Sequence, residues 1–144
     1  MQKIDQILIV GLGSIGQRHL CNLKKKHPNI KLLALSSKDQ GEVEGCKVVP
    51  TIEMAISHKP QVAFICNPSS LHIEVATKLV KEGIHLLIEK PLSNALEGID
   101  AFLKKTEASK ARIMVAYNLR FKKSLQFFRD VVISKEFGEV LAVS

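Results

Sequence analysis

A glycine-rich turn between an apolar run and a helical segment constrains this chain more than any other feature. Residues 7–10 are Ile-Leu-Ile-Val, and residues 11–16 continue as Gly-Leu-Gly-Ser-Ile-Gly, the pattern G-x-G-x-x-G. In a strand–turn–helix unit, Gly11 permits the tight turn, Gly13 lets the backbone approach a phosphate and Gly16 lets the helix pack closely on the strand. Backbone N–H groups at the start of such a helix bind a pyrophosphate. The motif predicts a dinucleotide-binding turn made by Gly11, Gly13, Ser14, Ile15 and Gly16.

Apolar runs and amphipathic segments alternate along the rest of the chain. Near-continuous apolar runs are typical of strands that are covered on both faces of a parallel sheet. Strand–helix alternation with short connections predicts right-handed crossovers. The predicted fold class is therefore α/β, a doubly wound parallel sheet of the Rossmann type. Strands are expected over residues 6–10, 30–35, 46–49, 61–65, 85–88 and 112–116, and helices over 14–26, 51–57, between 71 and 83, over 94–108 and over 124–134.

Two helix starts carry capping signals. Thr51 is expected to cap the helix that follows it. Asn94 with Glu97 resembles a capping box that opens the helix over residues 94–108. In that helix, Leu96, Ile99 and Leu103 are expected to face inward.

The last part of the chain breaks the strand–helix rhythm. Residues 139–143 read as a strand with no obvious partner. We expect a dinucleotide-binding domain over residues 1–120, followed over 121–144 by a linker helix and the first strand of an incomplete α+β domain. A chain ending in this way is expected to be a truncated form of a longer protein or gene.

Composition excludes several classes of protein. The net charge is +7, but the basic residues lie in short scattered clusters, and one Tyr without Trp makes a poor base-stacking surface. We therefore expect no nucleic-acid partner. No apolar run approaches the ~20 residues of a membrane span, and no signal peptide precedes the first strand, so a cytoplasmic location is expected. Three scattered cysteines favour neither a disulfide framework nor a metal site.

The end of the second expected strand bears on the choice of cofactor. An acidic residue about 20 positions after the glycine motif would bind the ribose 2′-hydroxyl of NAD. Here the residues are Ser36, Ser37 and Lys38, and Asp39 comes slightly late. Two hydroxyls and a cation suit a 2′-phosphate better, which favours NADP over NAD. The alternative is that Lys38 is a solvated loop lysine.

Polar residues also follow the next strands, at the sheet edge where ligands bind in doubly wound folds. Asn67 is expected to point its amide toward the cofactor, whereas His72, in the first turn of the next helix, reads better on its own as a surface or capping histidine. Glu89 and Lys90 follow the strand over residues 85–88. A lysine over an apolar floor can serve as an acid or base, and Glu89 could orient it, but a surface ion pair is an equal reading.

Four motifs in this order resemble the Gfo/Idh/MocA family of dehydrogenases. They are G-L-G-S-I-G-Q-R-H-L at 11–20, N-P-S-S-L-H at 67–72, E-K-P at 89–91 and Y-N-L-R-F at 117–121. The resemblance implies an oxidoreductase that transfers hydride between a nicotinamide and a hydroxyl-bearing carbon of a sugar-like or cyclitol-like small molecule. It implies that Lys90 relays the substrate proton and that Glu89 supports it as part of the catalytic site.

The resemblance also implies binding roles around these two residues. Asn67, Pro68, His72, Glu89, Lys90 and Asn118 match segments that contact the cofactor. Tyr117 and Arg120, with Lys90, match positions that contact the substrate. The Lys90–Pro91 peptide bond is expected to be cis.

One departure from the family is large. Its members continue into a second domain that walls the substrate pocket, carries a further Asp/His pair and builds a sheet dimer. That dimer is not expected from this chain, although another homo-oligomer stays open. The alternative function is a non-catalytic dinucleotide-sensing or partner-binding module, because a fold does not fix a function.

Overall fold

The fold is built on one seven-stranded sheet with the strand order β3-β4-β2-β1-β5-β6-β7. The structure, a computed structural model, describes residues 3–37 and 41–142. Every pairing is parallel except the β3–β4 pair at one edge. The described strands are β1 Gln6–Val10, β2 Lys31–Leu35, β3 Gly41–Val43, β4 Cys46–Val49, β5 Val62–Ile65, β6 His85–Ile88 and β7 Ile113–Val115.

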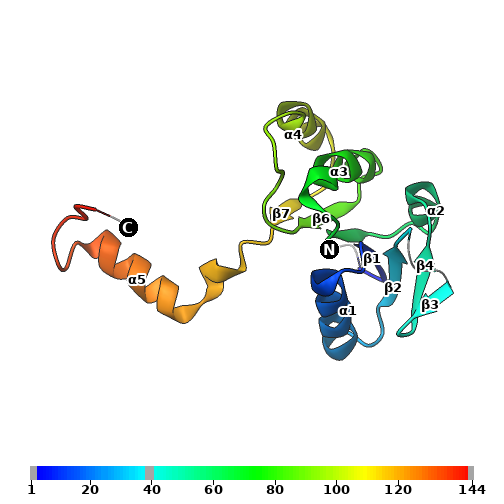
Figure 1. The fold of residues 1–144 in the computed structure, drawn as a ribbon, viewed down its shortest axis with the longest axis horizontal. Coiled ribbons are helices and arrows are strands. Elements are labelled where there is room, and N and C mark those ends of the chain that lie inside the picture. Colours follow the sequence, from blue (N-terminus) through cyan, green and yellow to red (C-terminus); the bar gives the residue numbers. More distant parts are fainter. Residues whose placement is uncertain (1–2, 38–40, 143–144) are drawn as a thin grey trace.

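Helices connect these strands and cover both faces of the sheet, so the predicted doubly wound α/β fold is confirmed (Figure 1). They are α1 Ser14–Lys26, α2 Ile52–Ser57, α3 His72–Lys81, α4 Ile99–Ala108 and α5 Lys123–Ser134, with short 3₁₀ turns at Ser69–Leu71 and Asn118–Phe121. The expected Thr51 cap is present, because its side chain accepts a hydrogen bond from the Met54 N–H at 3.2 Å. No helix among the described residues is long and apolar enough to cross a membrane.

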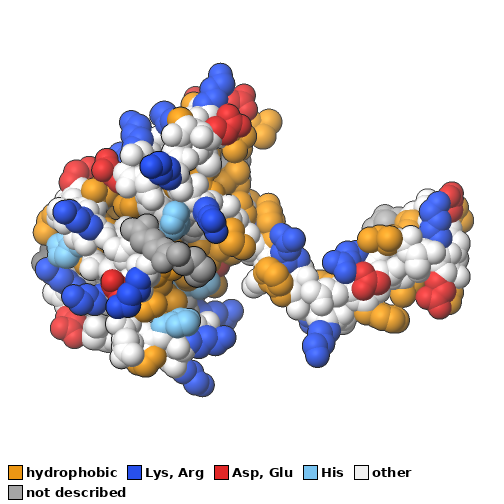
Figure 2. Space-filling view, turned by 180° about the vertical axis from the view of Figure 1, so that it is seen from behind, with side chains coloured by type: hydrophobic (Ala, Val, Ile, Leu, Met, Phe, Trp, Pro, Cys, Tyr) orange, Lys and Arg blue, Asp and Glu red, His pale blue; other side chains and the backbone are white. Residues whose placement is uncertain are grey.

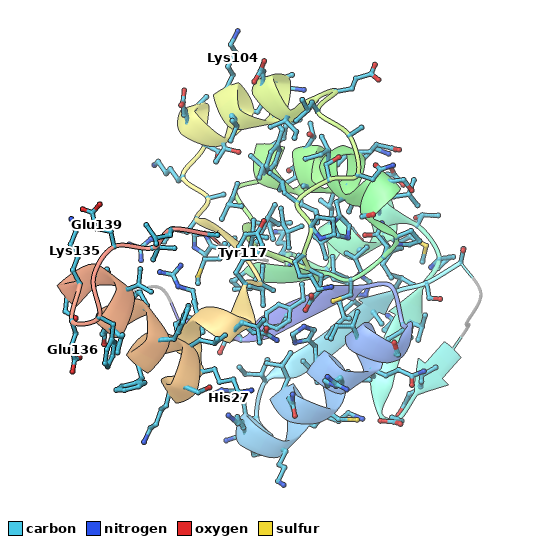
Figure 3. The ribbon with its side chains drawn as sticks, turned by 60° about the vertical axis from the view of Figure 1, so that its left-hand side comes forward. His27, Lys104, Tyr117, Lys135, Glu136 and Glu139 are labelled. Atoms are coloured by element: carbon cyan, nitrogen blue, oxygen red, sulfur yellow. The ribbon has the colours of Figure 1, made fainter. Side chains whose placement is uncertain are left out.

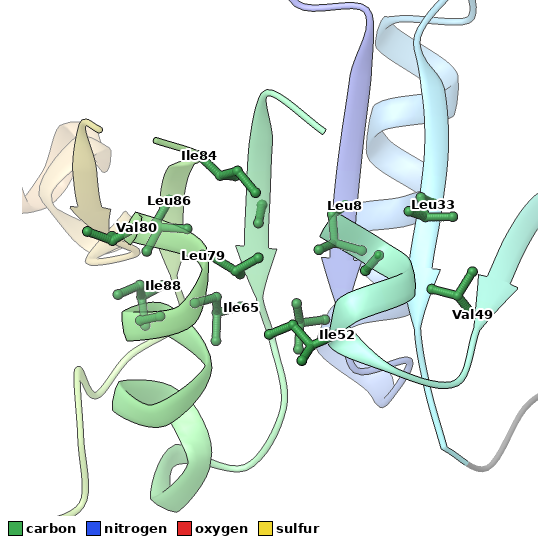
Figure 4. Close-up of a cluster of buried hydrophobic side chains, with 14 of the residues drawn as sticks. Leu8, Leu33, Val49, Ile52, Ile65, Leu79, Val80, Ile84, Leu86 and Ile88 are labelled. Atoms are coloured by element: carbon green, nitrogen blue, oxygen red, sulfur yellow. The ribbon is translucent and has the colours of Figure 1, made fainter. Parts of the chain in front are cut away.

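Alternation along the central strands divides the core into two layers. Leu8 of β1 faces the cluster formed with α2, α3 and α4 (Figure 4), whereas its neighbour Ile9 faces the cluster formed with α1. Leu33 and Ala34 of β2 divide in the same way. All four side chains are almost fully buried, which is why these strands read as continuous apolar runs.

The structure adds a strand that the sequence analysis did not predict. No strand is expected between residues 35 and 46, but Gly41–Val43 pairs antiparallel with Cys46–Val49. The connecting residues Glu44 and Gly45 have φ values of 51° and 70°. Positive φ at both central residues is the geometry of a tight two-residue hairpin turn, which explains the pairing.

The expected capping box at Asn94 is wrong. Helix α4 begins at Ile99, after Gly98 with φ of 78°. The Ser93 hydroxyl accepts a bond from the Ala95 N–H, a local contact that competes with a helical start. The inward face therefore differs from the prediction: Leu96 is 89% exposed and Leu103 46%, and Phe102 fills the core.

The expected strand at the C-terminal end is not found over residues 139–142, and residue 143 lies outside the described part. A strand needs a neighbour for its backbone hydrogen bonds. Helix α5 precedes this stretch and buries none of its residues. Figure 1 shows α5 extending away from the sheet and its helices.

Candidate functional site

The glycine turn joins the end of β1 to the start of α1 through close backbone contacts. Gly11 has φ of 88°, donates its N–H to the Leu35 carbonyl oxygen at 2.9 Å and leaves no room for a side chain, since an added Cβ would lie 2.9 Å from the Asn67 nitrogen. A Cβ added at Gly16 would overlap the Gly11 carbonyl oxygen. At Gly13, by contrast, an added Cβ would meet nothing within 4 Å. The turn is tight on its inner side and open over Gly13.

The start of α1 offers its backbone N–H groups to a ligand. Gly13 is the N-cap and has no side chain to accept a bond from the first turn, and that turn, fully within the described chain, holds no acidic residue. Lys24, Lys25 and Lys26 lie in the last turn, where cations complement the helix dipole. This helix end therefore suits an anion such as a pyrophosphate.

The end of β2 lies beside this turn. Ser36 follows Leu35, whose carbonyl binds Gly11, and the Ser36 N–H bonds to the Val49 carbonyl at 3.2 Å. Ser36 is half-buried and Ser37 is exposed. Lys38, the cation in the predicted cofactor-selecting set, lies outside the described residues.

His72 forms hydrogen bonds to the two segments that follow β5 and β6. Its Nε2 lies 2.9 Å from the Asn67 carbonyl oxygen and its Nδ1 lies 3.0 Å from the Pro91 carbonyl oxygen. Both partners are acceptors, so both bonds form only when each ring nitrogen carries a proton. The ring is 1% exposed, so the reading of His72 as a surface histidine is wrong.

Asn67 presents an unsatisfied acceptor. Its side-chain Oδ1 is buried and has no hydrogen-bond partner in the described part of the protein. Buried polar atoms in native proteins nearly always have a partner, so this oxygen suits a donor from a bound molecule. Pro68 follows it, exposed, at the turn into the 3₁₀ segment.

Glu89 and Lys90 follow β6, but in the part of the chain that the structure describes their side chains do not pair with each other. The Glu89 Oε1 lies 2.7 Å from Nε2 of His19 on α1. Its Oε2 accepts the Lys90 backbone N–H at 3.3 Å, and the Lys90 side chain is exposed. The alternative that Glu89 and Lys90 form a surface ion pair with each other is therefore wrong, because Glu89 pairs with His19 instead. The expected cis Lys90–Pro91 bond is present.

Cys66, which directly precedes Asn67 in the chain, has a buried thiol with a raised pKa. Burial raises the pKa of Cys66 to about 12, and the charge of Glu89 adds to that shift. Cys66 is 7% exposed and packs with the layer that includes Leu12 and Leu20. The Cys66 thiol is therefore uncharged near neutral pH.

Some of the predicted site residues line one cleft, and others line a separate cavity. A cleft of about 310 Å³ is lined by Ile15, Asn67, Ser69, His72, Glu89, Lys90 and Pro91. Tyr117 and Arg120 instead line a separate cavity of about 440 Å³ beside α5. Tyr117 is 58% exposed, and Figure 3 places it where the chain leaves the sheet for the segment that carries α5. Asn118 begins the 3₁₀ turn in the same stretch.

Sequence reasoning assigned no role to His19. The residue lies within the quoted motif at 11–20, and its position one helical turn after Gly16 was the available signal. Its carboxylate partner is 70 residues away, a separation that pattern reading does not bridge. Among the described residues, no group of three His, Cys, Asp or Glu side chains is placed to hold a metal ion.

Figure 2 shows Lys and Arg side chains spread over the visible face rather than gathered in one patch. The residues around the glycine turn, by contrast, fit a dinucleotide. The open space over Gly13, the uncapped start of α1 and the unpaired Asn67 Oδ1 are three separate places where such a ligand would bind.

The comparisons with known proteins agree with this geometry. Inositol 2-dehydrogenase of Rhizobium meliloti is 27% identical over 94% of this chain and 43% of its own length. The crystal structure of myo-inositol 2-dehydrogenase from Lactobacillus plantarum superposes with a TM-score of 0.84 at 22% identity, covering 96% of this chain and 43% of that one.

A second solved structure has the same fold. The WlbA dehydrogenase from Chromobacterium violaceum, in complex with NADH and UDP-GlcNAcA, gives a TM-score of 0.83 at 21% identity over 95% of this chain and 42% of that one. The chain thus spans about two fifths of the relatives it matches. The sequence profile described as an oxidoreductase family with an NAD-binding Rossmann fold matches residues 6–117. The chain therefore belongs to the Gfo/Idh/MocA family of oxidoreductases, of which it contains the NAD-binding Rossmann domain.

Proposed function

We propose that this chain binds a nicotinamide dinucleotide and supplies the proton-transfer lysine of a dehydrogenase. The substrate would be a hydroxyl-bearing sugar or cyclitol, such as those named for the relatives. The observation that carries the proposal is the cleft that places Lys90 next to Asn67 and the glycine turn. Residues 1–120 would form the dinucleotide-binding domain, and residues 121–144 would lead into a substrate domain of the complete protein.

The glycine turn and the start of α1 hold the pyrophosphate in this proposal. The N–H groups of Ser14 and Ile15, next to the open Gly13, face the phosphates. Asn67 Oδ1 accepts a bond from the nicotinamide half, and the imidazole of His72 fixes Asn67 in that place. Asn118 closes over the same half of the cofactor from the segment after β7.

Lys90 handles the proton at the substrate oxygen. When bound, the nicotinamide accepts or supplies the hydride. During alcohol oxidation, the hydroxyl proton passes to Lys90 Nζ as the carbon–oxygen double bond forms, and the reverse transfer accompanies reduction. In the reduction direction the lysine starts as the ammonium, and its charge stabilises the alkoxide that develops before the proton is transferred. Tyr117 and Arg120 would contact the substrate after the segment that carries them moves from its separate cavity toward the cleft.

The cofactor is proposed to be NADP, with NAD as the alternative. Ser36 and Ser37 at the end of β2 offer hydroxyls and no carboxylate, and Lys38 would add a cation for the 2′-phosphate. Isothermal titration with NADPH and with NADH tests this choice. Tighter binding of NADPH supports it, equal or weaker binding contradicts it, and no heat with either refutes cofactor binding.

Lys90→Met separates the catalytic proposal from a non-catalytic dinucleotide-binding module. The variant is expected to lose one contact to the cofactor but to keep measurable binding, because the glycine turn and the start of α1 still hold the pyrophosphate. Spectrophotometric hydride transfer with inositols and UDP-sugars, measured in the complete enzyme, is expected to fall by about 10²–10⁴-fold. Unchanged turnover would contradict the role of Lys90, whereas binding without turnover in the unmodified enzyme would favour the module.

A further inference from the structure

We infer that His19 is a positioning residue for the site, because it holds Glu89 and, through Glu89, the backbone of Lys90. The inference rests on the proposed function only for what Lys90 does once it is held. The three residues come from two elements, α1 and the end of β6, that adjoin the same cleft.

The first contact is short and partly buried. His19 Nε2 lies 2.7 Å from Glu89 Oε1, and the two side chains are 21% and 15% exposed. Hydrogen bonds at this distance to an ionised carboxylate are about twice as strong as neutral ones. A contact shielded from water is also less weakened by salt than one on the surface.

A neighbouring ring holds the imidazole in this orientation. The His19 ring meets Phe64 of β5 edge to face, with 5.2 Å between centroids and 86° between planes. Edge-to-face pairs of this kind are favourable beyond the area they bury. The ring is therefore held from one side by Phe64 while its Nε2 points at Glu89.

The second carboxylate oxygen carries the effect to Lys90. Glu89 Oε2 accepts the Lys90 N–H at 3.3 Å, directly before the Lys90–Pro91 bond. With Oε1 fixed by His19, rotation of the carboxylate would break both bonds together. Without His19, a mostly buried carboxylate would lose its partner near the neutral Cys66 thiol and would turn toward water.

This arrangement joins the two halves of the site. Helix α1 begins at the glycine turn, and His19 lies on its second turn. The same helix thus presents N–H groups to the cofactor and holds the loop that carries Lys90. His19 would keep the distance between phosphate-binding and proton-transfer elements fixed.

The test measures, by NMR, the rate of amide hydrogen exchange at Lys90 in the protein without cofactor. His19→Leu removes the donor at similar volume, and His19→Gln restores an N–H of similar reach. His27→Gln is the matched control, because His27 lies at the opposite end of α1 and is exposed (Figure 3). Folding of each variant is checked from the dispersion of its amide spectrum.

We expect exchange of the Lys90 amide to accelerate about tenfold in His19→Leu and in Glu89→Gln, to recover in His19→Gln and to stay unchanged in His27→Gln. The ring ¹⁵N signals of His19 should also shift in Glu89→Gln, while those of His27 do not. Lys90 exchange that is unaffected by His19→Leu would overturn the inference. If His19→Leu does not fold, unshifted His19 ring signals in Glu89→Gln would overturn it.

Failure of the proposed function gives a different result. If the chain bound no dinucleotide, cofactor titrations would be silent while the exchange pattern above remained. If the inference failed and the function held, cofactor would bind, but the exchange rate of the Lys90 amide would be the same in His19→Leu as in the unmodified protein. In the complete enzyme, His19→Leu is expected to lower kcat more than it raises KM, since the lysine is displaced rather than the substrate site.

Discussion

Gly13 and Gly16 stand in one turn, yet their surroundings are opposite. A Cβ at Gly16 would overlap the Gly11 carbonyl oxygen, whereas a Cβ at Gly13 would meet nothing within 4 Å. Gly16 is thus required by the packing of the folded chain, whereas Gly13 leaves space that the proposed pyrophosphate would use. Substitution at the two positions separates folding from binding.

Gly16→Ala is expected to destabilise the protein by about 1–3 kcal/mol, because the added methyl group forces α1 away from β1. Gly13→Ala is expected to change the free energy of unfolding by less than about 1 kcal/mol. Urea unfolding followed by circular dichroism measures both. Gly13→Ala is also expected to weaken cofactor binding at least tenfold, which titration checks. Equal stability of the two variants would contradict the packing argument.

The two buried thiols make stability fall at high pH. Burial raises the pKa of Cys46 to about 11 and of Cys66 to about 12, above the ordinary value of 9. The stability contributed by each neutral thiol is complete below about pH 9 and is lost as pH rises through the folded-state pKa, because the unfolded chain loses its protons first.

Urea midpoints at pH 8 and pH 10.5 test this effect. The decrease between the two pH values is expected to be smaller in Cys66→Ala than in the unmodified protein, since one raised thiol is gone. Cys21→Ala is the control, because Cys21 is exposed. A decrease in Cys66→Ala as large as that of the control would contradict the prediction.

At the scale of elements, α4 is held by a single large side chain. Phe102 is 2% exposed and packs in the layer with α3, whereas the neighbouring Leu103 is 46% exposed. The helix starts only at Ile99. Its attachment to α3 and the core therefore depends on one aromatic anchor rather than on the apolar stripe expected from its sequence.

Phe102→Ala is expected to cost about 3–5 kcal/mol, because it leaves a cavity between α3 and α4. Leu103→Ala is the matched control and is expected to cost less than about 1 kcal/mol, since its side chain is already half in water. Asn94→Ala is expected to have no measurable effect, because Asn94 does not cap α4. Thermal unfolding of the three variants gives the order, and a costly Leu103→Ala would contradict it.

The central elements could be predicted from the sequence because their signals are local. The apolar run over residues 6–10 and the glycine motif define β1 and the start of α1 without reference to the rest of the chain. The start of α4 could not be predicted, because the Ser93 contact competes with the Asn94 pattern. A two-residue turn at Glu44 was likewise a weak signal for β3.

Some of the site residues could likewise be predicted from the sequence, and others could not. Asn67 and Lys90 follow strands, so the sheet rule placed them at one edge. The contact between His19 and Glu89 depends on how α1 lies across β1 and β5 toward the end of β6, which no local pattern encodes. The burial of His72 likewise depends on the Pro91 carbonyl, 19 residues further on.

At the scale of the whole molecule, the sheet and α5 are separate in their packing. Helix α5 buries none of its residues, and its aromatic side chains Phe127 and Phe128 are 72% and 65% exposed. Among the described residues, the fully buried side chains of the two layers lie between 7 and 102, and Ala111 and Ile113 pack against one of them. Folding of the sheet therefore does not depend on residues beyond 122.

Deletion of residues 123–144 is expected to shift the thermal midpoint by less than about 4 °C, because that change corresponds to roughly 1 kcal/mol or less. Differential scanning calorimetry of the full chain and of residues 1–122 measures the shift. A matched deletion of residues 99–144, which removes Phe102, is expected to unfold the protein. A large loss of stability in the shorter deletion would show that α5 supports the sheet.

The strand order has a consequence for how such a protein can change over evolution. The end of β2, with Ser36, and the end of β6, with Glu89, are separated by β1 and β5 and share no neighbouring strand. Substitutions at distant sites without shared partners combine additively. A lineage or an engineer could therefore exchange the segment after β2, where we propose that the nucleotide is selected, without disturbing the contacts of Glu89 and Lys90 after β6. The fold is modular across its central pair of strands.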